Sequence, residues 1–474
     1  MSGPDRVNAD PTIPFPRPSS LTRRRLLQAG AGAAALAAGA ASPSWAAAKG
    51  VPAIQGEPIT LTYWHGWTEQ WEEMVQFVVD QFHQRQSRIR IEPVVVPVGT
   101  QEQSTEFLAK LTAAIAAGEP PDIVTLFGST AIPTLASQGA LVPLDSLDGA
   151  DLPTVEAWMD PNVYRLGQYE DQMYGLSYWA GDFALIYNKA HFAEVGLDPA
   201  VGPATVADLD AFAERLTVRS GSGDISRMGF LPADLWLWGT VFGGTFYDPA
   251  ANEVTANDPN VLRALAWMRS YAEKYDAQKV AEFNEGLASE RAANLDPLIA
   301  GKFSMQMQGP WKLGDIKKFG DPNFDYGVVR PPLADAEAQP ANWTWGDIQV
   351  IPTGSKDPAA ALEFVKFTAG VDDPEGYAQR CTWGERPINV PVSRSVLEVP
   401  SFRQVVASHP GFDVFIDALL NGERIGSPPV MPAAAFFSDR LAAATESVML
   451  LETEPEPALD DLDQAVQSEL DRSR

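Results

Sequence analysis

The chain has 474 residues, more than one compact core usually serves, so we expect two domains or lobes. Hydrophobic residues make up 45% and charged residues 20%, a balance that excludes a disordered or fibrous chain. The formal net charge of −27 repels phosphate backbones and anionic lipid, so nucleic acid is a poor partner and strongly phosphorylated ligands are disfavoured.

The first 48 residues have the order of a signal peptide. Residues 22–27 read Thr-Arg-Arg-Arg-Leu-Leu, and a weakly apolar Ala/Gly-rich run follows. The arginines before Leu-Leu resemble a twin-arginine export signal, and Ala46 and Ala48 suit a cleavage site. We therefore expect 1–48 to be removed and the remainder to be soluble, in the periplasm or otherwise outside the cytoplasm. The alternative is a single membrane anchor.

Cysteine and histidine usage argues against three kinds of site. Cys381 is the single cysteine, which leaves no intrachain disulfide and no lipid-bearing Cys after the leader. The four histidines lie far apart in the sequence, without the close spacing of a zinc site. We therefore expect neither a metal nor a cofactor.

The region after the leader predicts alternating strands and helices. The predicted elements are a strand at 59–63, a helix at 71–82, a strand at 89–96, a helix at 107–115 and a strand at 123–127. This order predicts a parallel sheet, whose ligands bind beyond the carboxyl ends of the strands. The carboxyl ends of the first and third predicted strands therefore indicate 64–68 and 127–130 as ligand-binding segments.

A second set of elements follows from residue 183. Strands are predicted at 183–187, 303–307 and 347–351, and helices at 205–217, 260–275 and 358–369. A final helix carries apolar residues between 459 and 470. The predicted fold class is therefore α/β.

Several ordered segments resemble the extracellular sugar-binding proteins of ABC importers, the family that includes maltose-binding protein. They are Leu-Thr-Tyr-Trp-His-Gly at 61–66, Ala-Gly-Glu-Pro-Pro-Asp-Ile-Val at 117–124, Tyr-Gly-Leu-Ser-Tyr at 174–178, Leu-Ile-Tyr-Asn-Lys at 185–189, Phe-Gly-Gly-Thr at 242–245, Gln-Gly-Pro-Trp at 308–311 and Ile-Pro-Thr-Gly-Ser-Lys-Asp-Pro at 351–358. Each segment is weak alone, but their order is specific to the family.

The resemblance implies a two-lobed periplasmic-binding-protein fold with a hinge of several crossing segments. The expected N-terminal lobe is 57–181 plus 310–344, and the expected C-terminal lobe is 182–309 plus 345–474. Crossings are expected near 181–182, 309–310 and 345–346. The implied partners are a carbohydrate, on which the lobes close, and the transmembrane permease that recognises the closed form. We expect a monomer that is not an enzyme.

The chemistry of sugar binding singles out tryptophans and charged residues at strand ends and in loops. A pyranose has apolar C–H faces and a fringe of hydroxyls, which suit flat aromatic surfaces and charge-assisted hydrogen bonds. In the family, an aromatic ring at the position of Trp311 stacks on sugar. Every candidate could instead serve packing. The candidates are Trp64, His65, Phe127, Ser129, Trp179, Asp182, Trp236, Trp238, Trp311, Trp345, Asp347, Trp383 and Arg386.

The chain also departs from the maltose-binding pattern. Gly66, Trp67 and Thr68 replace polar residues at the end of the first strand, and Leu126 and Ser129 replace an aromatic and acidic pair. Maltose itself is therefore not implied.

Two alternatives remain open. A glycerol phosphate or sugar alcohol could replace the saccharide, although Arg386 is the main basic candidate. A secreted glycoside hydrolase would also use a Trp-lined cleft with two carboxylates, but no spacing in the sequence identifies such a pair.

Overall fold

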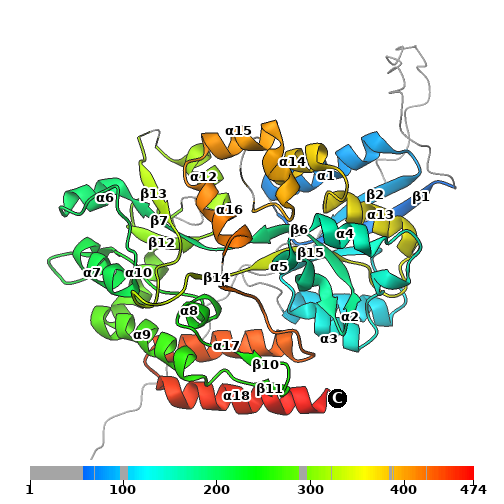
Figure 1. Cartoon of the computed structure of the whole chain (residues 1–474). Helices are drawn as coiled ribbons and strands as arrows, with labels where there is room; N and C mark the ends of the chain where they lie inside the picture. Colours follow the sequence, from blue (N-terminus) through cyan, green and yellow to red (C-terminus); the bar gives the residue numbers. More distant parts are fainter. Residues whose placement is uncertain are drawn as a thin grey trace, which may run out of the picture. The chain divides into compact units, whose positions relative to one another are not determined.

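A computed structural model describes residues 57–68, 70–96, 105–287, 296–321, 323–383, 387, 389–422 and 424–473. The predicted signal peptide and Arg386 lie outside these residues. The two larger sheets have five strands and three strands (Figure 1). Among the described residues, no helix combines the length and the apolar character needed to cross a membrane.

The five-stranded sheet has the order β2-β1-β3-β15-β6. Its strands are β1 (Ile59–His65), β2 (Ile89–Val95), β3 (Ile123–Phe127), β6 (Gly175–Gly181) and β15 (Trp345–Val350). β1 is parallel to β2 and β3, whereas β15 is antiparallel to both β3 and β6. Four strands therefore run in one direction, and their carboxyl ends lie at one edge of the sheet, which we call the carboxyl edge.

The helices α1 (Gln70–Arg85) and α2 (Thr105–Ala116) connect the first three strands, as predicted. α1 buries Met74, Val79 and Phe82, and its first turn carries acidic residues that complement the helix dipole. β3 is almost wholly buried, as expected for a strand inside an α/β sheet.

The three-stranded sheet has β7 (Ala184–Asn188) at its centre. β12 (Met305–Gln308) and β13 (Tyr326–Val329) pair with it in antiparallel fashion. A short strand β14 (Ala341–Trp343) pairs with β16 (Arg424–Gly426). Both predicted strands, at 183–187 and 303–307, are confirmed within two residues.

The strand pairing departs from the predicted lobe boundaries in two places. The chain leaves the first sheet at Gly181 and enters the second at Ala184, close to the predicted crossing. However, β12 and β13 both pair with β7, so Gly309 and Pro310 do not separate the two sheets. The chain returns to the five-stranded sheet after β14. Residues 345–350 form β15 of that sheet and so do not belong to the second lobe. Strand order depends on long-range pairing, which periodicity along the chain does not reveal.

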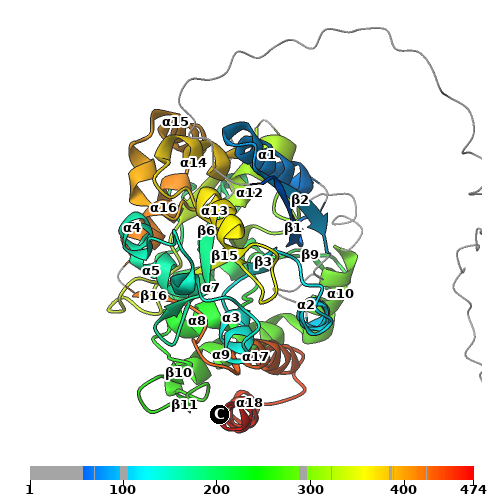
Figure 2. The same ribbon diagram turned by 90° about the vertical axis from the view of Figure 1, so that its right-hand side faces the viewer.

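A group of helices packs together beside β14 and β16. They are α8 (Leu235–Val241), α9 (Pro259–Tyr275), α17 (Ala434–Met449) and α18 (Pro455–Arg472), and both views show the last three side by side (Figures 1 and 2). The predicted helix at 260–275 is confirmed as α9, with Asp258 capping its first turn before Pro259.

The other helices lie between these strands in the chain or after them. They are α3 (Ala131–Ser137), α4 (Leu152–Trp158), α5 (Pro161–Tyr164), α6 (Lys189–Glu194), α7 (Val206–Leu216), α10 (Ala277–Gly286), α12 (Trp311–Phe319), α13 (Pro358–Thr368), α14 (Pro374–Cys381), α15 (Pro400–Ser408) and α16 (Phe412–Leu420). α7 and α13 confirm two further predictions. Thr205 and Asp208 form a reciprocal capping box that explains where α7 begins.

Candidate functional site

Three predicted ligand residues meet at the carboxyl edge. Asp347 of β15 lies opposite Phe127 of β3 on one side and Trp179 of β6 on the other. A bulge between Asp347 and Ile348 shifts the register at this point, and such bulges re-aim side chains near functional sites. The sheet therefore brings together residues that are far apart in the sequence.

Two aromatic residues that the candidate set lacked complete this group. The Trp67 indole NH donates to the Tyr178 hydroxyl at 3.1 Å. The Trp67 ring also contacts Phe127 and Trp179, with centroids 4.7 and 5.8 Å apart. Trp67 lies within 64–68, a segment indicated by the rule that ligands bind beyond the carboxyl ends of parallel strands. That rule could therefore have identified Trp67 from the sequence.

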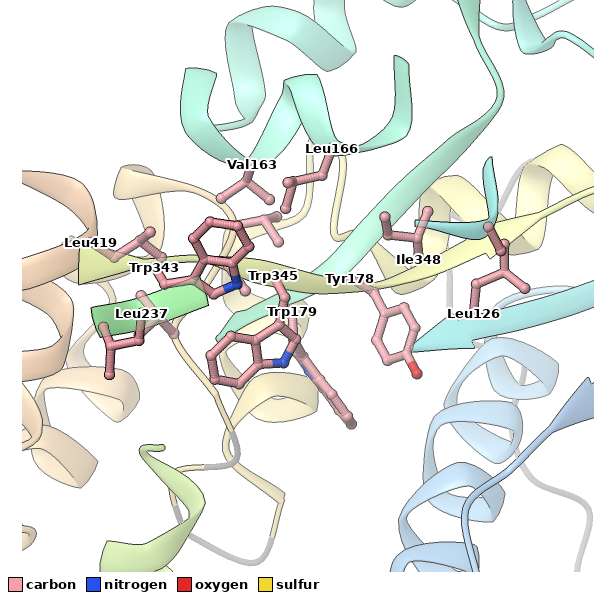
Figure 3. Packing of buried hydrophobic residues seen from close by; sticks show 14 of the residues in the cluster. Leu126, Val163, Leu166, Tyr178, Trp179, Leu237, Trp343, Trp345, Ile348 and Leu419 are labelled. Carbon is pink, nitrogen blue, oxygen red and sulfur yellow. The ribbon is translucent and has the colours of Figure 1, made fainter. Parts of the chain in front are cut away.

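Trp179 is the buried member of this group. Only 1% of it is exposed, and with Tyr178 it lines a cavity of about 20 Å³, room for about one water molecule. Figure 3 shows Tyr178, Trp179 and Trp345 gathered along β6 and β15. Phe127 and Trp67, by contrast, are half-buried and present surface.

A second aromatic group lies where the chain leaves one sheet for the other. The Trp345 ring contacts Phe183 at 4.8 Å and Trp311 at 6.0 Å between centroids. Trp345 is nearly buried and crosses over Gly181, where a side chain would clash with its ring. Trp311 begins α12 and keeps part of its ring exposed.

Asp182 is held in the connection beside this second group. Its carboxylate is fully buried and accepts one hydrogen bond, from the Asn342 side-chain amide at 3.1 Å. The same amide donates to the Phe183 carbonyl at 2.9 Å, so Asn342 ties the outgoing and returning segments together. Burial raises the pKa of Asp182 well above its ordinary value, although the charge of Arg330 opposes this. Asp182 is therefore buried in the connection between the two sheets and has no exposed surface.

The residues at the end of β1 differ in exposure. Trp64 is half-buried. His65 is 1% exposed, and no side-chain hydrogen bond to its ring is found among the described residues. Burial lowers the pKa of His65 to about 4, despite the opposing effect of the Trp67 backbone, so the ring is neutral at physiological pH. Its position is that of a packed residue.

The remaining candidates divide between core and surface. Trp238 has no exposed surface and packs against Trp267 at 4.6 Å between centroids, which makes it a core residue. Trp236 stacks on Trp343, with the ring centroids 5.1 Å apart and 14° between the ring planes. This contact does not involve the aromatic group around Phe127. Ser129 is buried in the turn before α3.

The loop at 383–386 is described only in part. Trp383 is half-buried and packs on the core, and Arg386 lies outside the described residues. Within those residues, no cluster of His, Cys, Asp and Glu has the composition of a metal site.

Similar proteins share both sequence and fold with this chain. The structure described as CpMnBP1 with mannotriose bound is 27% identical, covers 86% of this chain and 100% of its own, and superposes with a TM-score of 0.72. The GacH receptor of Streptomyces glaucescens shares the fold at 22% identity, 88% and 99% coverage and a TM-score of 0.69. Both support the two-lobed architecture.

The sequence relatives include sn-glycerol-3-phosphate-binding periplasmic proteins. The Brucella abortus protein is 25% identical over 283 residues, 57% of this chain but only 61% of the relative's length. The Yersinia enterocolitica protein is 24% identical, with 78% of this chain and 84% of the relative covered.

The profile of the bacterial extracellular solute-binding proteins matches residues 78–404. Since this match covers more than half of the chain, the protein belongs to the bacterial extracellular solute-binding protein family.

Proposed function

We propose that this protein is the solute-binding component of an ABC importer, which captures a mono- or oligosaccharide between two lobes and delivers it to the permease. One lobe would be built on the five-stranded sheet and the other on the three-stranded sheet. The observation that carries this proposal is the aromatic carboxyl edge. Trp67 and Phe127 present partly exposed rings, and Asp347, which is 4% exposed, lies opposite Phe127 across the strand pair; aromatic rings and a carboxylate suit pyranose faces and hydroxyls.

The bound sugars of similar structures support the same ligand class. The relative at 27% identity binds mannotriose in one structure and mannobiose in another. We therefore place di- and trisaccharides first.

Glycerol phosphate is the second candidate, because the sequence relatives are named for it. A phosphate needs cationic or backbone NH partners in the site. Among the charged candidates, Arg386 lies outside the described residues and Asp182 is fully buried, which leaves the acidic Asp347 at the carboxyl edge. This charge balance favours a neutral ligand.

Thermal unfolding with a panel of ligands tests the proposal. Mannobiose, mannotriose, maltose and acarbose form one arm, and glycerol 3-phosphate forms the other. A ligand at 100 times its Kd stabilises the folded protein by about 2.7 kcal/mol, enough for a clear rise in Tm. A rise with glycerol 3-phosphate and with no saccharide would contradict the assignment.

The same mixtures of protein and saccharide also test whether the protein hydrolyses glycosidic bonds. We expect no catalysis, because the family consists of binding proteins. Incubation with oligosaccharides should release no new reducing ends, and sustained release would support a glycoside hydrolase instead.

Export and assembly complete the proposal. Residues 1–48 would act as a twin-arginine signal peptide, and the mature protein would be a monomer outside the cytoplasm without a lipid anchor. A twin-lysine substitution of Arg23 and Arg24 should retain the precursor in the cytoplasm. Light scattering of the mature protein measures its mass directly.

A further inference from the structure

The loop after β1 holds a tryptophan whose orientation is set by a neighbouring strand. We propose that Trp67 is a further ligand-stacking residue and that Tyr178 is the positioning residue that orients its ring. This inference rests on the proposed saccharide function and extends it to two residues outside the candidate set.

The contacts of Trp67 define the position of its ring. Its indole NH donates to the Tyr178 hydroxyl at 3.1 Å. Phe127 and Trp179 contact the ring edge-to-face, at interplanar angles of 79° and 65°, and Trp71 of α1 lies 5.6 Å away between centroids. Residues from β3, β6 and α1 therefore hold one loop residue, which remains partly exposed.

Tyr178 is itself fixed on both its backbone and its phenol. The Tyr377 hydroxyl donates to the Tyr178 carbonyl at 2.7 Å and accepts from the Val392 NH at 3.0 Å. The Tyr178 phenol lies in a buried polar cluster with Tyr63 and Thr125. Burial raises the pKa of Tyr178 well above its ordinary value, so the phenol stays protonated.

These contacts matter because the second side-chain torsion of tryptophan is intrinsically broad. A single directional hydrogen bond, together with edge-to-face neighbours, selects one ring orientation in advance of binding. Pre-organisation of this kind lowers the entropic cost of stacking on a sugar. Trp67 keeps exposed surface next to Phe127, whose ring lies 4.7 Å away between centroids, so the held ring retains surface on which a sugar can stack.

Two substitutions separate stacking from positioning. Trp67→Ala removes the surface, and we expect the Kd for mannotriose to rise at least about fivefold. Tyr178→Phe keeps the volume and removes only the hydroxyl, and we expect a smaller rise of roughly two- to fivefold. Trp267→Phe is the matched control, because Trp267 is also half-buried with its indole NH bonded, to Asp210 at 3.0 Å, but belongs to α9. Its Kd should match the wild type.

A spectroscopic measurement adds a second readout, the chemical environment of the Trp67 indole. The indole ¹⁵N–¹H resonance of Trp67 is assigned by its loss in Trp67→Phe. Mannotriose should shift this resonance, and Tyr178→Phe should shift it without ligand.

The outcomes are distinct. If the wild type binds no saccharide of the panel, the proposed function fails first. If the wild type binds mannotriose while the Trp67 resonance stays unchanged and Trp67→Ala retains full affinity, stacking by Trp67 is overturned. If Trp67→Ala weakens binding but Tyr178→Phe changes neither affinity nor the resonance, the positioning role of Tyr178 is overturned.

Discussion

Gly309 lies directly under the ring of Trp311, and replacing it with alanine should disturb both stability and binding. An added Cβ at this position would lie 1.9 Å from Cζ3 and 2.2 Å from Cη2 of the Trp311 ring. Carbon atoms in contact normally lie about 3.5 to 4.0 Å apart. The ring must therefore move by more than about 1 Å.

The expected cost follows from two effects. Forcing a group into packed space costs about 1–3 kcal/mol of unfolding free energy. Displacing the ring also weakens its edge contact with Trp345, at 6.0 Å between centroids, and such contacts contribute about 0.5–1.5 kcal/mol. If Trp311 stacks on the saccharide, a loss of about 1.4 kcal/mol there corresponds to a tenfold rise in Kd.

Urea unfolding and titration calorimetry with mannotriose measure the two effects separately. Gly286→Ala is the control, because a Cβ at the end of α10 meets no heavy atom of the described residues within 4 Å. It should not lower the stability, since alanine is favoured over glycine in a helix by up to about 1 kcal/mol.

A double-mutant cycle isolates the clash itself. In a Trp311→Ala background the ring is absent, so Gly309→Ala should cost much less than in the wild type. If Gly309→Ala has the unfolding free energy and the mannotriose Kd of the wild type, the Trp311 ring is not confined above Gly309.

Three further predictions concern buried polar groups. The raised pKa of Asp182 means that the folded state holds this proton more tightly than the unfolded state, so its contribution to stability falls as pH rises above about 4. Asp182→Asn should remove this loss in urea unfolding from pH 4 to 8, and a constant difference from the wild type would contradict it. The lowered pKa of His65, about 4, has the opposite consequence: stability falls as pH drops from about 6.5 towards 4, by at most about 3 kcal/mol. His65→Phe should flatten this part of the profile, and an unchanged profile would point to other groups. Asn342→Ala removes the hydrogen bonds to Asp182 and Phe183 and should lower the unfolding free energy by about 2–4 kcal/mol, whereas a cost below about 0.5 kcal/mol would mean that water replaces the amide.

Local patterns predicted much of the fold and part of the site. Alternation in 59–63 and helical spacing in 71–82 predicted β1 and α1, because each element must bury one face. The rule that ligands bind at carboxyl ends indicated the loops after β1 and β3, and the structure places Trp67 and Phe127 there. The predicted ligand residues nevertheless omitted Trp67, although it lies in the indicated segment 64–68, and they omitted Tyr178, which only its contact with Trp67 reveals.

The sequence by itself determined the α/β class, the first three strands with their helices, and the aromatic composition of the loops, because these depend on residue types and short-range spacing. Only the tertiary structure decided that β15 inserts between β3 and β6, which moves 345–350 into the first sheet and sets Asp347 between Phe127 and Trp179. It also decided that Trp238 is core and that Trp311 and Trp345 meet at the hinge. The physical reason is that strand order and side-chain burial arise from contacts between residues tens to hundreds of positions apart, such as Trp311 with Trp345 and Phe127 with Asp347, and such contacts leave no periodic trace along the chain.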